Sequence, residues 1–403
     1  MKYRYIISIF LTGIFLLGIS TSGFATHQGI VSPSAIRQGA LGIKYFLRAE
    51  LERTNFDDVD LSNVRYLAEL DLNLLASGGP PRDGIPSVDL PRLISPEEAA
   101  TWLEDNDLVI GLRFNGAVRA YPVNILNWHE ITNDILNGIP VVVTYCPLCN
   151  SALAFVAPEI NGQIAQFGIS GRLFKSDLVM YDRVTGTFWS QIEALPIVGP
   201  LVGRVGKLHQ VPVDIIPWGL WQAENPETMV MDRPVFGDVL GGVQTRPISG
   251  ILFPRDYGRD PYAAYKRSNS NTFGTPFSDT RLRAKDDVIG IIIDGDTKAY
   301  ARKAYDELSL LNDRIGNTPI LVVKTPADQV RFFVRRDVER DRALEFEFID
   351  GRLIDKQTRS VWNFRGEAVS GEFAGTQLEE ISAIPSFWFA WVSFNPDTEL
   401  FTG

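Results

Sequence analysis

The sequence contains few of the side chains that most often carry chemistry. Its 403 residues include two cysteines, three histidines and four methionines. A zinc finger needs a second cysteine pair, so the cysteine count excludes that class. The motifs of serine hydrolases, phosphate-binding loops and dinucleotide-binding turns are absent from the sequence as well.

Positive charge is also scarce. The chain has 39 lysine and arginine residues against 49 aspartate and glutamate residues, which gives a formal net charge of -10. No stripe of basic residues offsets this acidity, so the sequence argues against a nucleic-acid partner. The composition is compatible with a small-molecule, metal or protein partner and identifies none of them.

Long apolar runs are missing from the sequence beyond its N-terminus. There, Lys2 and Arg4 precede an apolar stretch at residues 6–19, and the small residues Gly23 and Ala25 follow. This pattern predicts a signal peptide at residues 1–25 that is cleaved near Ala25. An uncleaved anchor is the alternative, but a membrane span needs about 20 apolar residues. We expect an exported protein, periplasmic or extracellular, with no stable membrane span after cleavage and with its cysteines in an oxidising compartment.

Both cysteines lie in one motif. An apolar run at residues 141–143, rich in β-branched side chains, predicts a buried strand that leads into a Cys-Pro-Leu-Cys sequence at Cys146 and Cys149. Two thiols at this spacing can form a small disulfide, bind a soft metal, or act as attacking and resolving sulfurs. Residues 152–156 predict a further strand, where a thioredoxin-type fold would begin a helix. The motif therefore does not indicate a thioredoxin.

The chain repeats itself. Residues 109–121 match residues 288–300 without a gap, with an Asn-Gly hairpin turn in the first copy and Asp-Gly in the second. Further matches follow at similar spacing, such as Trp189 with Trp362. We therefore predict an α+β fold of two tandem ββαβ-type repeats, each with a β-rich C-terminal half, preceded by a short helical N-terminal region.

The predicted organisation has five parts. They are the signal peptide (1–25), an N-terminal helical and Gly/Pro-rich region (26–100), repeat one (101–245), a connecting segment (246–281) and repeat two (282–403). Helical segments are expected at residues 43–53 and 64–75. A capping box formed by Ser95 and Glu98 predicts a short helix that ends near Glu104.

Comparison of the two copies isolates the residues that differ between them. In the second copy Thr325 and Asp328 replace Cys146 and Cys149, Leu308 replaces His129, Ser309 replaces Glu130, and Asn363-Phe364 replaces Ser190-Gln191. The second copy lacks the thiols, so any thiol chemistry belongs to the first copy.

His129 is predicted to lie near the thiols. Residues 125, 129, 132 and 136 form one face of a helix predicted to end near Gly138, and the following strand would return so that His129 faces about Thr144. An imidazole at that place would help to stabilise a thiolate, with a thiol pKa below about 8.5. His129→Leu would then keep or raise stability and impair metal uptake. The alternative is a buried core histidine with its hydrogen bonds satisfied.

Several motifs together resemble the domain of unknown function 3179 family. They lie at residues 78–86, 128–134, 144–149 and 170–183, and the resemblance extends from about Gly78 to the C-terminus. It implies a Cys-Pro-Leu-Cys motif at Cys146 to Cys149 and a histidine at His129, without implying an activity. The predicted topology alone is similar to that of organomercurial lyase and of copper-handling NosL-type proteins.

Three functions remain open. In a thiol enzyme or redox protein, Cys146 and Cys149 would attack and resolve while His129 and Glu130 transfer protons. In a metal-binding module, the thiolates would hold copper as Cu(I), or zinc together with His129 and one more ligand. In a non-enzymatic binding or structural protein, the cysteines would form a small disulfide. The neighbouring polar residues are secondary candidates for the site: Asn150, Ser151, Ser190 and Gln191.

Overall fold

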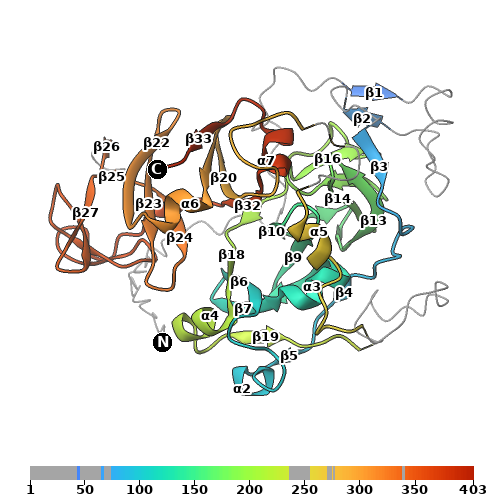
Figure 1. Ribbon diagram of the computed structural model, residues 1–403, viewed down its shortest axis with the longest axis horizontal. Helices are drawn as coiled ribbons and strands as arrows, with labels where there is room; N and C mark the ends of the chain where they lie inside the picture. Colours follow the sequence, from blue (N-terminus) through green and yellow to red (C-terminus); the bar gives the residue numbers. More distant parts are fainter. Residues whose placement is uncertain are drawn as a thin grey trace, which may run out of the picture.

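The computed structural model describes residues 43–45, 65–67, 74–235, 255–269, 275, 277–337 and 341–403. The fold is α+β, and strands predominate over a few short helices (Figure 1). The described elements that precede the first half are β1 (Ile43–Tyr45), β2 (Arg65–Leu67), β3 (Leu75–Ser77), β4 (Val88–Asp89), β5 (Leu93–Ile94) and α2 (Pro96–Ala99). Ser95 and Glu98 form the predicted capping box, although helix α2 ends at Ala99, before Glu104.

The first half of the chain runs from β6 to β19. Its elements are β6 (Leu108–Phe114), β7 (Ala117–Pro122), α3 (Val123–His129), β8 (Ile131–Leu136), β9 (Ile139–Cys146), β10 (Ser151–Val156), β11 (Glu159–Ile160), β12 (Gln163–Ile164), β13 (Phe167–Phe174), β14 (Asp177–Asp182), β15 (Phe188–Ser190), β16 (Leu195–Val198), β17 (Gln210–Val211), β18 (Asp214–Pro217), α4 (Trp218–Glu224) and β19 (Met229–Met231). Helix α5 (Ala263–Arg267) lies in the segment that connects the two halves.

The second half runs from β20 to β33. Its elements are β20 (Asp287–Ile293), β21 (Asp296–Ala301), α6 (Arg302–Asp306), β22 (Leu310–Ile315), β23 (Thr318–Lys324), β24 (Val330–Val334), β25 (Arg336–Asp337), β26 (Arg342–Ala343), β27 (Phe346–Ile349), β28 (Arg352–Asp355), β29 (Val361–Trp362), β30 (Ala368–Ser370), β31 (Glu379–Glu380), β32 (Ile384–Phe387), α7 (Trp388–Phe394) and β33 (Glu399–Phe401).

The sheets of the two halves have similar strand orders. In the first half the described orders are β18-β6-β7-β19-β5, β17-β10-β9-β8-β4 and β1-β2-β16-β15-β14-β13-β3. In the second half they are β32-β20-β21-β33, β22-β23-β24-β31 and β27-β28-β29-β30. A strand of the first half therefore pairs with neighbours equivalent to those of the strand at the corresponding position in the second half.

Individual hydrogen bonds also recur. The Trp221 indole donates to Thr228 Oγ1 at 2.9 Å, and the Trp391 indole donates to Thr398 Oγ1 at 3.0 Å. Three further hydrogen bonds of the first half have a counterpart in the second half. The bond from Trp189 to Asp182 corresponds to that from Trp362 to Asp355, the bond from Tyr121 to Asp134 to that from Tyr300 to Asp313, and the bond from Asn133 to Phe167 to that from Asn312 to Phe346.

One predicted helix is wrong. Helix α3 ends at His129, and residues 131–136 form strand β8 rather than a continuation of the helix. Glu130 ends the helix because its backbone adopts φ 56°, outside the right-handed helical region. In the second half, α6 likewise gives way to β22. Each half thus begins with two hairpins joined by a short helix, so the predicted ββαβ unit contains one strand more.

The predicted N-terminal helices are also not found where the structure describes this region. Residues 43–45, 65–67 and 75–77 form strands β1, β2 and β3. The remaining residues of the two predicted helical segments lie outside the described residues, apart from Leu74, and so does the predicted signal peptide. None of the described helices has the length and apolar character needed to cross a membrane.

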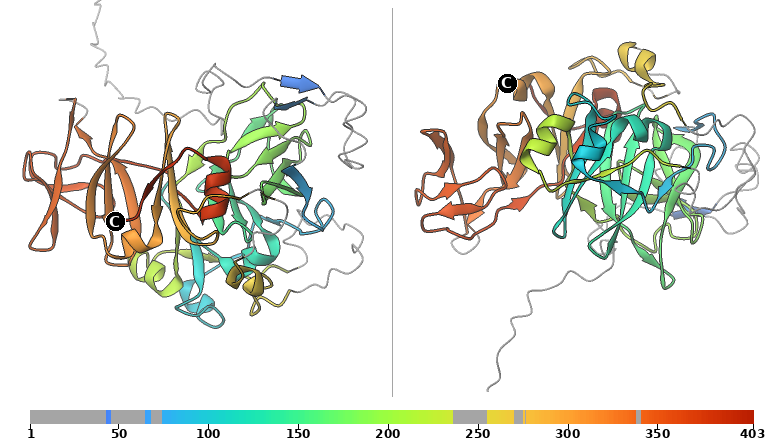
Figure 2. Two further views of the ribbon diagram at one scale, coloured as in Figure 1. Left: turned by 45° about the horizontal axis from the view of Figure 1, so that its top comes forward. Right: turned by 90° about the horizontal axis from the view of Figure 1, so that it is seen from below.

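The two halves lie side by side and share a hydrophobic core. Figures 1 and 2 show α7 and β32 of the second half against the strands of the first. One buried cluster contains Cys146 and Cys149 together with Phe387, Trp388 and Trp391. Burial of this shared apolar surface favours the docked arrangement, and it places the cysteine motif at the boundary between the halves.

Candidate functional site

The cysteine motif forms a tight turn between two paired strands. Strand β9 ends at Cys146 and β10 begins at Ser151, and these two residues pair in the antiparallel ladder. The Cys149 amide donates to the Cys146 carbonyl at 3.2 Å, and Asn150 adopts φ 52°. We call residues 146–150 the thiol turn. Its two thiols are free in the structure, and both are buried.

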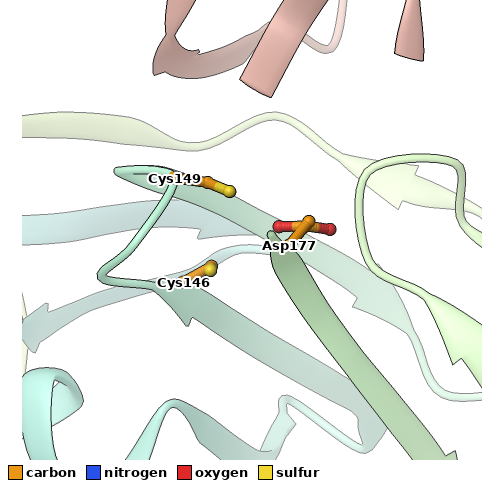
Figure 3. A group of neighbouring side chains, drawn as sticks. All are labelled: Cys146, Cys149 and Asp177. Atoms are coloured by element: carbon orange, nitrogen blue, oxygen red, sulfur yellow. The ribbon is translucent and has the colours of Figure 1, made fainter. Parts of the chain in front are cut away.

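A second turn brings a carboxylate to the thiols. Lys175 and Ser176, between β13 and β14, adopt φ 52° and 66°, values that favour glycine or asparagine. This turn places the Ser176 carbonyl 3.3 Å from Cys149 Sγ and 3.9 Å from Cys146 Sγ. The next residue is Asp177, and one of its carboxylate oxygens lies within 4.8 Å of both sulfurs. Figure 3 shows the three side chains pointing toward one another.

Hydrogen bonds hold the Asp177 carboxylate in place. Oδ1 accepts from Ser151 Oγ at 3.3 Å, and Oδ2 accepts from the Ile192 amide at 3.2 Å. Ser151 also donates to Gln191 Oε1 at 2.8 Å, and Gln191 Nε2 donates to Thr144 Oγ1 at 2.8 Å. Two of the predicted secondary residues, Ser151 and Gln191, therefore belong to the network around Asp177. Ser190 is buried beside them, and its Oγ accepts from the Glu193 amide at 3.4 Å.

Burial favours the protonated form of each acid in the site. It raises the pKa of both thiols, and it raises the pKa of Asp177 to about 7. The charge of Asp177 raises the thiol pKa values further. The prediction of a thiol pKa below the ordinary value is thus wrong for the metal-free site, because desolvation disfavours the thiolate.

Glu130 is a fourth buried acid near the thiol turn. Its carbonyl accepts from the Tyr145 amide at 2.8 Å, which places it beside the end of β9. Burial raises its pKa to about 8, and its charge is among the causes that raise the pKa of Cys146. Glu130 Oε1 accepts from the Tyr262 hydroxyl at 3.5 Å. Glu130 is therefore a buried acid beside the end of β9, outside the group formed by the cysteines and Asp177.

His129 does not belong to the thiol group, contrary to the prediction. Its Nδ1 lies 2.7 Å from the Pro86 carbonyl oxygen, and its Nε2 lies 2.7 Å from the Tyr257 hydroxyl. The carbonyl can only accept, so Nδ1 carries the proton and Nε2 accepts from Tyr257. Burial lowers the pKa of His129 to about 4, so the ring is neutral. His129 thus connects three segments of the fold, as the alternative of a satisfied core histidine describes.

The sequence comparison missed Asp177 because it hid this residue among the shared positions. At the spacing that aligns Asp182 with Asp355, Asp177 aligns with Asp350, which lies in a turn of the second half at φ 50°. A comparison that isolates the differences between the copies does not single out a residue type that both copies share. The two connections are equally long, at residues 175–176 and 350–351, but β14 has six residues and β28 has four. The longer strand places Asp177 at the start of β14, whereas Asp350 lies in the turn.

The comparison with protein families gives one match. The family described as a protein of unknown function (DUF3179) matches residues 82–398, which include the thiol turn, Asp177, Glu130 and His129. No curated protein and no solved structure matches the chain. The likeness in topology to organomercurial lyase and NosL-type proteins stays a prediction. The match covers most of the chain, and the protein therefore belongs to the DUF3179 family, whose function is unknown.

Proposed function

We propose that this protein binds one divalent metal ion, with zinc as the first candidate, through Cys146 Sγ, Cys149 Sγ and a carboxylate oxygen of Asp177. The observation that carries the proposal is the convergence of these three buried ligand atoms within 4.8 Å of one another. Thiolates and carboxylate oxygens are both among the ligands that zinc takes in proteins, and three protein ligands leave a fourth position for water or another ligand.

The charge of the site supports a cation. Cys146, Cys149, Asp177 and Glu130 are all buried acids, and no lysine or arginine is among the causes that shift their pKa values within the described residues. A bound dication would supply the missing positive charge and would displace protons from its ligands. The carboxylate oxygen favours zinc over Cu(I), which prefers sulfur ligands alone.

A dithiol–disulfide couple is the second candidate function. Two free thiols in one turn favour it, because each could reach the other after a small change in the turn. Oxidation would join the two sulfurs, release two protons and pass two electrons to an external disulfide or quinone. This function uses Asp177 only as an acceptor for a thiol proton and does not require three ligand atoms to converge, which is the reason for placing it second.

The experiment measures metal content and affinity. The purified protein, reduced and loaded with zinc, should retain one ion per chain, and Co2+ in its place should give thiolate-to-metal charge-transfer absorption. Cys146→Ser, Cys149→Ser and Asp177→Asn should each weaken binding at least about tenfold, because each removes a ligand. His209→Gln, at an exposed position, is the control.

Two outcomes would decide against the metal. If the wild type holds no more metal than Cys146→Ser, the proposal fails. A reversible mass loss of two hydrogens on oxidation, together with no metal binding, would favour the dithiol–disulfide couple instead.

We further infer that residues 108–231 and 287–401 are copies of one unit, and that residues 101–245 and 282–403 correspond to the two repeats. The similar strand orders and recurring hydrogen bonds support this inference. Only the first copy carries the thiols, which is why one ion per chain is expected. Superposition of the two halves of an experimental structure tests the inference, and unrelated environments of Trp189 and Trp362 would contradict it.

A further inference from the structure

The thiol turn is held from outside by the second half of the chain. The Phe387 amide donates to the Cys149 carbonyl at 2.7 Å. Asn150 Nδ2 donates to Asp287 Oδ1 at 3.0 Å, and Asn150 Oδ1 accepts from the Tyr145 hydroxyl at 2.9 Å. Two consecutive residues of the turn thus bond to the second half.

These two contacts come from one pair of facing residues. Asp287 and Phe387 are directly opposite each other where β20 pairs with β32. We call this pair the clamp. A cavity of about 250 Å³ lies beside it and is lined by Asn150 and Asp287. Close packing does not fix the turn on that side, so the hydrogen bonds of the clamp must do so.

The corresponding pair in the first half cannot form such contacts. Leu108 and Pro217 are directly opposite each other where β6 pairs with β18, at the same register as the clamp. Leucine has no polar atom in its side chain, and proline has no amide hydrogen to donate. The residue that matches Asn150 is Gln329, and its Oε1 accepts from Arg331 in its own half at 3.4 Å.

We infer that the second half, which lacks the thiols, is specialised to position the thiol turn of the first half, with Asp287 as the positioning residue for Cys149. The inference rests on the proposed metal function, and it assigns a role to the copy without ligands. Asp287 touches neither the sulfurs nor a bound ion. It fixes Asn150, which follows Cys149, and Phe387 fixes the Cys149 carbonyl itself.

The test replaces Asp287 by leucine, the residue type found at the matching position, Leu108, of the first half. Asp287→Leu removes the acceptor for Asn150, whereas Asp287→Asn keeps an acceptor oxygen and should restore most of the contact. We expect Asp287→Leu to weaken Cd2+ binding about tenfold, the loss expected for one hydrogen bond to a charged group. Asp287→Asn should bind within about twofold of the wild type. The control is His209→Gln, at an exposed position that does not line the cavity beside the clamp.

Two readouts distinguish positioning from general stability. The shape of the Co2+ charge-transfer spectrum should change in Asp287→Leu alone, since ligand geometry sets that spectrum. Iodoacetamide should alkylate the thiols of metal-free Asp287→Leu faster than those of the wild type or His209→Gln. If the wild type binds no metal, the proposed function fails, and the alkylation rates still decide the positioning role. Equal alkylation rates and equal Cd2+ affinity in Asp287→Leu and wild type would overturn the inference.

Discussion

At the scale of single residues, desolvation decides the protonation of the site. Asp177 and Glu130 have pKa values raised to about 7 and about 8, and both thiols are shifted upward as well. Each bound proton neutralises a thiolate or a carboxylate, and no lysine or arginine of the described residues is among the causes that shift the pKa values of these groups. A cation that replaced these protons would gain the full attraction of several anions in a medium of low polarity.

The raised carboxyl pKa values predict how metal-free stability depends on pH. A folded pKa above the unfolded value means that the folded state binds the proton more tightly, so the stabilisation is complete below the unfolded pKa. It is lost as pH rises from about 4 to about 7 for Asp177, and to about 8 for Glu130. The loss should be on the order of a few kcal/mol, since one pKa unit is about 1.4 kcal/mol.

Urea unfolding of the metal-free protein at about pH 5 and about pH 8 measures this effect. Asp177→Asn and Glu130→Gln should each reduce the difference between the two pH values. A stability that is the same at both pH values in wild type and variants would contradict the prediction.

His129→Leu should destabilise the protein and leave metal binding intact. The change leaves the Pro86 carbonyl and the Tyr257 hydroxyl without the contacts they make to the ring, at a cost of about 1–3 kcal/mol. The sequence alone predicted the opposite sign for stability and a loss of metal uptake. Denaturant unfolding and zinc affinity, measured on the same preparation, separate the two views. Weaker zinc binding at unchanged stability would support the earlier prediction.

At the scale of elements, the site depends on turns that hold unfavourable backbone conformations. Glu130, Asn150, Lys175 and Ser176 all have positive φ, and they surround the thiols at the ends of α3, β9 and β13. Such residues each cost about 1–3 kcal/mol and persist only where the surrounding structure fixes them. Here the paired strands, the Asp177 network and the contacts with the second half provide that support.

Two glycines on matching strands predict that an added methyl group lowers the stability of the protein about equally in either half. A Cβ on Gly111 would lie 2.3 Å from Trp221 Cε3, and one on Gly290 would lie 2.1 Å from Trp391 Cζ3. Gly111→Ala and Gly290→Ala should therefore each destabilise the protein by about 1–3 kcal/mol or more through overpacking. In Gly258→Ala, the control, the nearest atom would be 3.4 Å away. Thermal unfolding compares the three variants, and a neutral effect at only one of the two strands would argue against equivalent halves.

At the scale of the whole molecule, the halves differ in role more than in fold. The first contributes the thiols, Asp177 and Glu130. The second contributes the clamp and the aromatic residues Trp388 and Trp391 of the shared core. Helix α5 adds a further contact, because the Tyr265 hydroxyl donates to the Leu148 carbonyl at 3.0 Å. The site therefore requires segments from three distant parts of the chain.

Export remains a prediction at this scale. The charged, apolar and small-residue pattern of residues 1–25 predicts secretion with cleavage near Ala25. The intact mass of the protein recovered from the periplasm or the medium should correspond to a chain that begins near residue 26. A recovered mass that includes residues 1–25 would contradict cleavage.

Much of the fold could be predicted from local patterns. Asn115-Gly116 and Asp294-Gly295 identified the hairpins, β-branched residues identified β9, and the capping box of Ser95 and Glu98 identified the start of α2. The extent of α3 could not be predicted, because the positions Ile125, Thr132 and Leu136 fit the period of one long helix as well as a helix followed by a strand. The change depends on Glu130, whose positive φ no local preference predicts.

The sequence by itself determined that any thiol chemistry must involve Cys146 and Cys149, since the chain has no other cysteines. Only the tertiary structure decided what surrounds the thiols. Asp177 lies at the start of β14, 28 residues beyond Cys149 in the chain, and Asp287 belongs to the other half. His129, closer in the chain, points to Pro86 and Tyr257 instead. Proximity in space follows from sheet register and from the docking of the halves, and no short stretch of sequence encodes either one.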